Sequence, residues 1–289
     1  MKDKTEVLVV GATGYLGLHI VDELTRRNTP FKALARNKVK LLKHGIAENH
    51  IVTAEVTRPE SLNGVCDGVT TVISCLGITR QRDGLSYADV DYQANLNVLQ
   101  EAERSGVKQF IYVSAFNADK YPEVRLLGAK EHFAQRLLSS RIPEPKVIRP
   151  NGFFSDLEAI YHMASKGKAY VFGQGAVRLN PIHGQDLARF CIEAMDINQR
   201  EFAVGGPEVL SNREIAELAF HVQNKKANII GLPDWIRKLV LILAKRLPEK
   251  WGGPVEFFLT MLQKDAIAPC YGQHTLGQHY AQCCQDEVN

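Results

Sequence analysis

"VLVVGATGYLG" (residues 7–17) decides the fold, because it joins a short apolar strand to the start of a helix through a glycine-rich turn. Gly11, Gly14 and Gly17 allow a tight turn and a close approach of the backbone to a pyrophosphate group. The next residues, "LHIVDELTRR" (18–27), have the spacing of an amphipathic helix, whose N-terminus offers N–H groups and a positive dipole to phosphate. The stretch therefore predicts the first strand–turn–helix unit of a dinucleotide-binding domain.

The first half of the chain repeats this alternation of strand and helix. Apolar runs rich in Val and Ile predict strands at 6–10, 31–35, 50–56, 70–76, 109–115 and 145–150. Helical patterns lie between them at 15–27, 38–44, 59–63, 88–105 and 125–139. Apolar strands without alternation, separated by helices, are typical of a parallel sheet covered on both faces. We therefore expect a doubly wound parallel α/β sheet, a Rossmann fold, over residues 1–150.

Residues 151–289 are expected to form a smaller mixed α/β lobe that binds the substrate and is interleaved with the first domain. Short strands are predicted at 169–172, 177–180 and 201–204, and helices at 154–165, 184–195, 211–222, 233–247 and 254–264. No Ser/Gly-rich linker, internal repeat or low-complexity tract separates the halves. The second half is therefore interpreted as a lobe that closes over the open end of the sheet.

Composition narrows the class of protein. The net charge of +3 comes without a block of five like charges or a basic stripe interleaved with aromatics, which excludes a nucleic-acid-binding protein. The first apolar run is too short for a signal peptide, and no stretch approaches eighteen apolar residues, so a cytoplasmic protein is expected. The cysteines lack Cys-x-x-Cys spacing and are expected to be reduced thiols: Cys66, Cys75, Cys191, Cys270, Cys283 and Cys284.

The end of the second predicted strand distinguishes between the two nicotinamide cofactors. An acidic residue there would bond the ribose 2′-hydroxyl and repel a 2′-phosphate. This chain has Arg36 instead, followed by Lys38 and Lys40. An arginine can stack on adenine and pair with a phosphate through its planar fork, whereas the alternative is an ordinary charged surface. The pattern favours NADP(H) over NAD(H).

Two further segments, "VDYQANLNVLQEAERSGVKQFIYVSAF" (90–116) and "VIRPNGFF" (147–154), complete a family pattern. Together with the glycine turn and Arg36, they resemble the atypical, NmrA-like short-chain dehydrogenase/reductases. The resemblance implies pyrophosphate contacts from the turn, an adenosine phosphate at Arg36, and an adenine near Glu55 and Val56, where the family usually has Asp and an apolar residue. It further implies that residues after the fourth and fifth strands contact the cofactor and that a third group of residues lies next to the nicotinamide ring. The residues implied are Gly11, Thr13, Gly14, Tyr15, Leu16 and Gly17 for pyrophosphate; Cys75, Leu76, Gly77 and Ser114 after the strands; and Asn151, Gly152 and Phe153 at the nicotinamide.

A narrower resemblance extends over nearly the whole chain. "SCLGITR" (74–80), "LLGAKEHFAQRLL" (126–138), "PIHGQDLARF" (181–190) and "CYGQHTLGQHYA" (270–281) are similar, in order, to segments of divinyl chlorophyllide 8-vinyl reductases. Those enzymes use NADPH to reduce a conjugated vinyl group on a chlorophyll precursor. The resemblance implies a small hydrophobic substrate.

"RLLGAKEHF" (125–133) carries Lys130 where short-chain dehydrogenases have the lysine of a Tyr-x-x-x-Lys pair, but Leu126 stands in the tyrosine's place. Residues four apart share a helix face, and leucine cannot exchange a proton there, so conventional alcohol–ketone chemistry is not expected. Lys130 is the predicted catalytic residue, binding the ribose hydroxyls and placing a positive charge near nicotinamide. Hydride addition to an activated double bond needs little more than orientation and a favourable field.

Two questions about the chemistry stay open at this level. The proton could come from Lys130, Tyr161, His162 or water. The missing tyrosine is also compatible with a non-catalytic NADP(H)-binding redox sensor or an accessory protein of a respiratory complex.

Other polar residues give weaker signals. His183 in "NPIHGQDLA" (180–188) is expected at a strand-to-helix turn, with Asp186 helping to satisfy the helix N-terminus. No His-x-x-x-His pair or Cys/His cluster has zinc spacing, and no Gly-x-Ser-x-Gly elbow occurs. No metal is therefore expected.

"DWIRKLVLILAKRL" (234–247) has one broad apolar face and a basic face. Such a helix either packs into the core of the second lobe or lies at a membrane surface or at the mouth of a site for a lipophilic substrate. The apolar face comprises Trp235, Ile236, Leu239, Val240, Ile242, Leu243 and Leu247.

Overall fold

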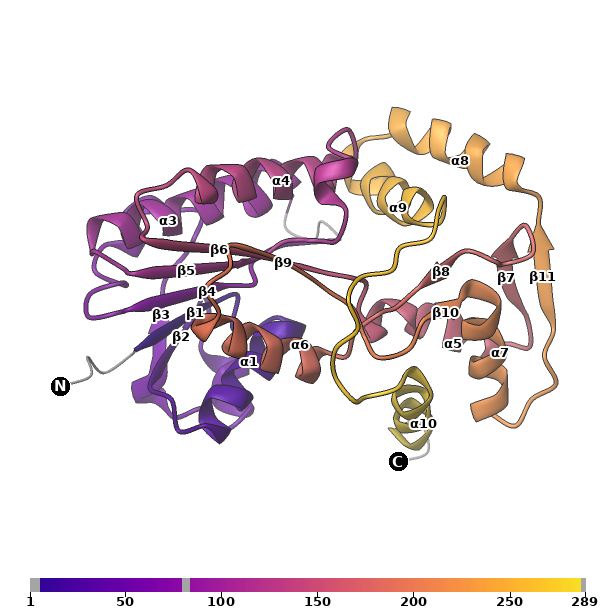
Figure 1. The fold of residues 1–289 in the computed structure, drawn as a ribbon, viewed down its shortest axis with the longest axis horizontal. Helices are drawn as coiled ribbons and strands as arrows, with labels where there is room; N and C mark the ends of the chain where they lie inside the picture. Colours follow the sequence, from indigo (N-terminus) through magenta and orange to yellow (C-terminus); the bar gives the residue numbers. More distant parts are fainter. Residues whose placement is uncertain (1–5, 80–83, 287–289) are drawn as a thin grey trace. The chain divides into compact units, whose positions relative to one another are not determined.

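The computed structural model describes residues 6–79 and 84–286, and the chain divides into two compact units (Figure 1). The first unit is formed by the chain up to Arg149 together with Leu187–Phe202. The second is formed by Pro150–Asp186 together with the chain from Ala203 onward.

The first unit is built on a seven-stranded sheet in the order β3-β2-β1-β4-β5-β6-β9. Every neighbouring pair from β3 to β6 is parallel, and the order reverses between β1 and β4, as in dinucleotide-binding folds. The doubly wound fold class is therefore confirmed. The strands are β1 (Val7–Val10), β2 (Phe31–Ala35), β3 (Ile51–Thr53), β4 (Thr71–Ser74), β5 (Gln109–Val113), β6 (Glu144–Pro150) and β9 (Glu201–Val204).

Helices of the first unit cover the sheet close to their predicted positions. Apolar side chains recur every three or four residues, so each helix buries one face. The core between the sheet and helices α3 and α4 contains Val98, Phe110, Tyr112 and Phe133. The helices are α1 (Tyr15–Arg26), α2 (Val39–Lys43), α3 (Asn95–Arg104) and α4 (Arg125–Leu138), with short turns η1 (Glu48–His50), η2 (Pro59–Leu62), η3 (Ala88–Ala94) and η4 (Ala118–Lys120).

The second unit is a mixed α/β lobe with its own core, as expected. It contains two small sheets, β8 with β10 (antiparallel) and β7 with β11 (parallel). Its core includes Phe154, Tyr161, Phe220 and Tyr280. Helix α6 (Gly184–Glu193) passes from the second unit into the first, where η6 (Ala194–Asp196) follows. The other elements are η5 (Phe154–Leu157), α5 (Glu158–Ser165), β7 (Ala169–Phe172), β8 (Arg178–Leu179), β10 (Leu210–Ser211), α7 (Asn212–Val222), β11 (Ile229–Leu232), α8 (Asp234–Arg246), α9 (Glu249–Met261) and α10 (Leu276–Asp286).

Three of these elements were not predicted. β10 has only two residues, and β11 is a half-buried edge. Helix α10 buries only Leu276 and Tyr280, which is too few apolar positions to give a periodic signal. Helix α9 begins at Glu249 rather than 254 and has Pro254 inside it.

The apolar face of α8 is exposed, so the core-packing interpretation of this segment is wrong. Arg237, Leu241 and Ala244 are the buried side chains of the helix. Arg237 donates hydrogen bonds to the Asp234 carboxylate at 2.6 Å and to the Leu259 carbonyl at 3.1 Å. The Arg237 guanidinium is thus on the buried side of α8, and the wide apolar face of the helix is exposed to solvent. Exposed large apolar side chains of α8, α9 and their connection are Trp235, Leu239, Val240, Ile242, Leu243, Leu247, Trp251 and Val255.

The described part of the chain has no helix with both the length and the apolar composition needed to cross a membrane.

Candidate functional site

The glycine turn between β1 and α1 is fixed by close packing. Gly11 has a φ of +81°, and a Cβ there would lie 3.1 Å from the backbone of Cys75 and Leu76. A Cβ on Gly17 would lie 2.2 Å from the carbonyl oxygen of Gly11, so only glycine lets α1 start this close to the turn. Gly14 caps α1 without a side-chain hydrogen bond, and the first turn of the helix holds no acidic residue. The backbone N–H groups in the first turn of α1 have no partner within the helix, and they fit the phosphates of a dinucleotide.

The other predicted residues of the turn are accessible or support it. Gly14 and Tyr15 are exposed and Thr13 is half-buried, whereas Leu16 is buried under the helix. The Lys40 ammonium donates a hydrogen bond to the Thr13 carbonyl at 2.6 Å, which links α2 to the turn.

A basic and an acidic side chain face each other at the ends of β2 and β3. Arg36 Nε lies 4.0 Å from Glu55 Oε2, and the arginine side chain is 57% exposed. Glu55 also accepts a hydrogen bond from Thr57 Oγ1 at 3.0 Å. Val56 is buried, and its carbonyl accepts a hydrogen bond from the Asn97 amide at 2.9 Å. Lys38 pairs with Glu48 rather than turning toward Arg36.

Lys130 on α4 forms an ion pair with Asp91, a residue that the sequence analysis did not select. Lys130 Nζ lies 2.8 Å from Asp91 Oδ1; the carboxylate is inaccessible to solvent and the lysine side chain is 13% exposed. A Cβ on Gly77 would lie 2.6 Å from Asp91 Oδ1 and 2.7 Å from Lys130 Nζ. A side chain at position 77 would displace the end of one of these two side chains, so glycine lets the loop after β4 pass directly over the pair.

The charge of Lys130 is stabilised by its surroundings. Burial by itself lowers the pKa of the lysine, but the Asp91 carboxylate, followed by Tyr112, outweighs burial and leaves the pKa above its usual value. Lys130 is therefore a permanent cation at neutral pH and a poor proton donor. This argues against Lys130 as the source of the proton.

Asp91 is positioned by a π-helical turn, η3, and by the loop after β4. Its Oδ2 accepts a hydrogen bond from the Ile78 N–H at 3.2 Å. The Asn95 amide donates to the carbonyls of Val90 and Asp91 at 3.3 and 3.1 Å, and its oxygen accepts from Ser74 Oγ at 2.6 Å. Wide helical turns of this kind often occur at functional sites. The only sequence signal was the pair of polar residues four apart on the helix, Asp91 and Asn95.

Helix α4 itself is held by a second buried ion pair next to Lys130. Arg149 on β6 contacts Glu131 at 2.5 Å and Glu201 at 3.0 Å. Because Glu131 follows Lys130 directly, this link fixes the rotation of α4 and thus the direction of the lysine.

Tyr112, the tyrosine described next to Lys130, does not replace the missing one. Leu126 is 2% exposed and part of the buried face of α4. Tyr112 on β5 approaches Lys130, with the ammonium 5.7 Å from its ring centroid, but the tyrosine is fully buried and packs edge-on against Phe133. Burial raises the pKa of Tyr112, so its hydroxyl stays protonated and out of reach of a substrate. That the protein lacks conventional alcohol–ketone chemistry stays a prediction.

Side chains after β4 and β5 complete this part of the first unit. Ser114 is buried, and its hydroxyl has no hydrogen-bond partner among the residues described. A buried hydroxyl of this kind is expected where a ligand supplies the hydrogen bond. The Cys75 thiol donates to the Val10 carbonyl at 3.2 Å, and burial raises its pKa to about 12, so it is not a nucleophile. Leu76 is half-buried beside it.

The residues expected to border nicotinamide belong to the second unit. Asn151 is buried and donates both amide hydrogens within that unit, to Asn180 Oδ1 at 2.8 Å and to the Ala266 carbonyl at 2.6 Å. Gly152 is exposed, with no described atom within 4 Å of a Cβ built on it, and Phe153 is half-buried. Asn151 therefore organises the backbone, while Gly152 and Phe153 are the accessible members of the three.

Other residues considered from the sequence take different roles. Tyr161 is fully buried and packs against Tyr280, so it is not a proton donor, whereas His162 is exposed on α5. His183 precedes α6 as expected. Asp186 instead accepts hydrogen bonds from the N–H groups of Gln273 and His274, at 2.9 and 3.0 Å, and thereby anchors the loop before α10.

The geometry of the first unit fits a dinucleotide, and comparison with known proteins supplies its family. A model of NAD(P)H-binding proteins matches residues 11–197. The chain belongs to this NAD(P)H-binding, Rossmann-fold oxidoreductase family. NAD(P)H is accordingly its cofactor.

The relatives include vinyl reductases and photosystem II assembly factors. The chain is 30% identical over 270 residues to the chloroplastic divinyl chlorophyllide a 8-vinyl-reductase of Zea mays, covering 86% of this chain and 67% of that protein. It is 26% identical over 233 residues to the photosystem II assembly factor Ycf39 of Synechocystis, covering 78% of this chain and 70% of that protein. Both the resemblance to the atypical dehydrogenases and that to the vinyl reductases are confirmed.

Solved structures show the same fold at low identity. The NADPH-dependent quinone oxidoreductase of Escherichia coli, complexed with NADPH, has a TM-score of 0.73 at 15% identity and covers 96% of this chain and 99% of its own. The UDP-glucose 4-epimerase of Thermotoga maritima has a TM-score of 0.71 at 14% identity, covering 99% and 100%.

Proposed function

We propose that the protein is an NADPH-dependent reductase that saturates an activated carbon–carbon double bond in a hydrophobic conjugated substrate, as its vinyl-reductase relatives do. The observation that carries this proposal is the Lys130–Asp91 pair at 2.8 Å beside a buried Leu126. The site has a fixed cation, and the phenol that approaches this cation, Tyr112, is fully buried, so the site suits hydride addition better than proton exchange with an alcohol.

The chain's own residues divide the task of holding NADPH. In this proposal the glycine turn and the start of α1 bind the pyrophosphate through Gly11, Thr13, Gly14, Tyr15, Leu16 and Gly17. Arg36 receives the 2′-phosphate, and Glu55 and Val56 border the adenine. Cys75, Leu76, Gly77, Ser114 and Lys130 hold the ribose next to nicotinamide, and Asn151, Gly152 and Phe153 border the ring.

NADPH supplies the hydride when bound. Lys130 contributes an electrostatic field that stabilises the carbanion or enolate formed as the double bond is reduced. Because its pKa is raised, Lys130 keeps its proton, and in this proposal the proton comes from water or from the exposed His162.

A second candidate function comes from the Ycf39 relatives, which are named as assembly factors. A protein that binds NADPH without turnover would act as a sensor or an accessory protein. Purified protein loaded with NADPH should be mixed with quinones, enones and divinyl tetrapyrroles while the absorbance of the reduced nicotinamide is followed. The reductase proposal predicts loss of that absorbance with at least one conjugated substrate; persistence with all of them supports the sensor.

Cofactor preference gives a separate test at Arg36. Arg36→Ala is expected to weaken NADPH binding about 10- to 100-fold, the range for losing a hydrogen-bonded charge partner, and to leave NADH binding nearly unchanged. The measurement is calorimetric titration with both cofactors. Lys43→Ala removes the same charge from exposed α2 and should alter neither affinity. Equal wild-type affinity for NADPH and NADH would contradict the role given to Arg36.

We further propose that the exposed apolar surface of α8 and α9 rests on an anionic membrane, from which a lipophilic substrate could be drawn. Trp235 and Trp251 are 63% and 68% exposed. Lys238, Lys245, Arg246 and Lys250 lie among these apolar residues and are exposed. Exposed tryptophans with flanking basic residues are typical of helices that lie in the interface of anionic lipids.

Vesicle flotation tests this contact. Wild-type protein should float with vesicles of phosphatidylcholine and phosphatidylglycerol, and Trp235→Ala/Trp251→Ala should reduce the bound fraction about tenfold or more, since each ring buries a large apolar area. Tyr170→Ala, at another exposed aromatic residue of the second unit, is the matched control and should bind as wild type does. Equal flotation of the double variant, or none of the wild type, would exclude this surface.

A further inference from the structure

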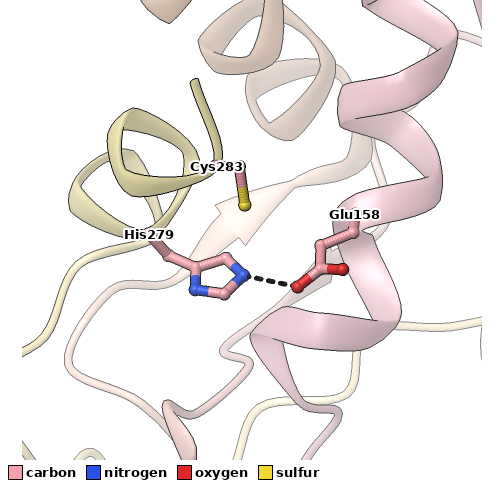
Figure 2. A group of neighbouring side chains, drawn as sticks. All are labelled: Glu158, His279 and Cys283. Atoms are coloured by element: carbon pink, nitrogen blue, oxygen red, sulfur yellow. Dashed lines mark hydrogen bonds and ion pairs between the residues drawn. The ribbon is translucent and has the colours of Figure 1, made fainter. Parts of the chain in front are cut away.

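A histidine, a cysteine and a glutamate, none of which was assigned to the cofactor, converge in the second unit. The ligand atoms of Glu158, His279 and Cys283 all lie within 4.8 Å of one another. Figure 2 shows the imidazole of His279 facing the carboxylate of Glu158. The Cys283 side chain projects from the helix that carries His279. His279 Nε2 and Glu158 Oε1 are 3.0 Å apart.

Helices α5 and α10 present these groups in a fixed arrangement. His279 and Cys283 are four residues apart on α10 and so share one face of it. Between them Tyr280 is fully buried, and its hydroxyl donates a hydrogen bond to the Leu157 carbonyl at 3.0 Å, directly before Glu158 begins α5. The N-terminus of α10 is also fixed, since the Leu276 N–H donates to Glu208 at 3.0 Å. The two helices that carry the three donors are therefore held together independently of these donors, and the His279 side chain is 13% exposed.

The donor set is that of a borderline transition metal. Imidazole nitrogen, thiolate sulfur and carboxylate oxygen are the three ligand types of zinc sites, and donors around such an ion lie about 3 to 4 Å apart. Calcium and magnesium would need more oxygen ligands than this cluster offers. Three protein ligands leave one tetrahedral position for water.

The surroundings provide access and support. A pocket of about 500 Å³ opens beside the cluster and is lined by His183, His274, His279 and neighbouring glutamine residues. The ring centroids of Phe154 and His183 lie 5.7 and 5.9 Å from that of His279 and limit its movement. An ion could enter through this pocket while the imidazole keeps its orientation.

We propose that Glu158, His279 and Cys283 form a zinc site that fastens helix α10 to helix α5. The ion replaces the present hydrogen bond between His279 and Glu158 and binds Cys283 as a thiolate, releasing the thiol proton to solvent. Sequence spacing connects only His279 with Cys283, because Glu158 stands 121 residues before His279 and only folding brings it to them. The proposal does not depend on the cofactor site.

Cobalt is the probe for this site, because a cysteine thiolate bound to Co²⁺ gives a near-ultraviolet charge-transfer band. The full-length protein is stripped with chelator under reducing conditions and titrated with Co²⁺ alone, and then with Zn²⁺. We expect one equivalent of Co²⁺ to produce the band and Zn²⁺ to remove it. An absent band in the wild-type protein would overturn the proposal without reference to any variant.

Neighbouring cysteines provide a matched control. Cys283→Ala should abolish the band, whereas Cys284→Ala, one residue further along α10, should leave it intact. His279→Ala and Glu158→Gln should weaken Co²⁺ binding about 10-fold or more, as expected for lost ligands or their oriented partners. Zn²⁺ should also raise the thermal midpoint of the wild type and of Cys284→Ala but not of Cys283→Ala. Equal behaviour of the two cysteine variants would show adventitious thiol binding and reject the site.

Discussion

Replacing Lys130 by methionine is expected to reduce the rate of NADPH oxidation about 100- to 1,000-fold, comparable to losing one preorganised stabiliser of a transition-state charge. The cation beside Gly77 is lost, while the length and apolar stem of the side chain are kept. In steady-state kinetics the loss should appear mainly in kcat, with a smaller rise in the KM for NADPH from the missing ribose contact. Lys108→Met, on an exposed part of the first unit, should leave both constants unchanged.

Stability has to be separated from chemistry in this experiment. Asp91 is inaccessible to solvent, so Lys130→Met leaves an uncompensated buried carboxylate, which costs about 3 to 5 kcal/mol. Adding Asp91→Asn removes that charge. The double variant should therefore regain much of the lost free energy of unfolding while staying inactive. Recovery of activity together with stability would show that Lys130 only supports the fold.

Gly17→Ala is expected to lower the free energy of unfolding by about 3 kcal/mol or more, at the upper end for overpacking, and to abolish NADPH binding. The added methyl group would lie 2.2 Å from the Gly11 carbonyl oxygen and 2.7 Å from Ala12 Cα, and both are backbone atoms that cannot rotate away. The start of α1 would have to move out of the glycine turn. Chemical denaturation and cofactor titration measure the two effects.

Gly14→Ala is the informative comparison. Its methyl group would meet only the Gly11 carbonyl, at 3.2 Å, and Gly14 is exposed where the pyrophosphate is proposed to lie. This variant should fold with nearly wild-type stability but bind NADPH more weakly. If Gly14→Ala binds NADPH as the wild type does, the pyrophosphate lies elsewhere.

Most of the first unit could be predicted because its signals are local. The glycine turn and the apolar runs 31–35 and 109–115 are each decided by neighbouring residues, and the structure has strands and helices at these places. In the second unit the signals weaken. Helix α10 buries two residues only, so its pattern resembled a loop.

The candidate site was predictable one element at a time. Lys130 could be selected from its motif, but its counter-ion Asp91 lies on another helix, and nothing in the spacing connects them. The same holds for Glu158 with His279 and Cys283. For α8 the apolar face was read correctly, yet a helical wheel does not say what covers that face, and Arg237 rather than Leu239 is directed inward.

The most direct measurement of the central claim follows the hydrogen itself. The protein is given NADPH deuterated at C4 of the nicotinamide, together with a divinyl tetrapyrrole or whichever conjugated substrate consumes NADPH, and the product is analysed by mass spectrometry and NMR. The account predicts one deuterium on a carbon of the former double bond, with the second hydrogen coming from solvent. A product without label, or bound NADPH that stays intact with every substrate while Lys130 and Asp91 remain paired, would contradict it.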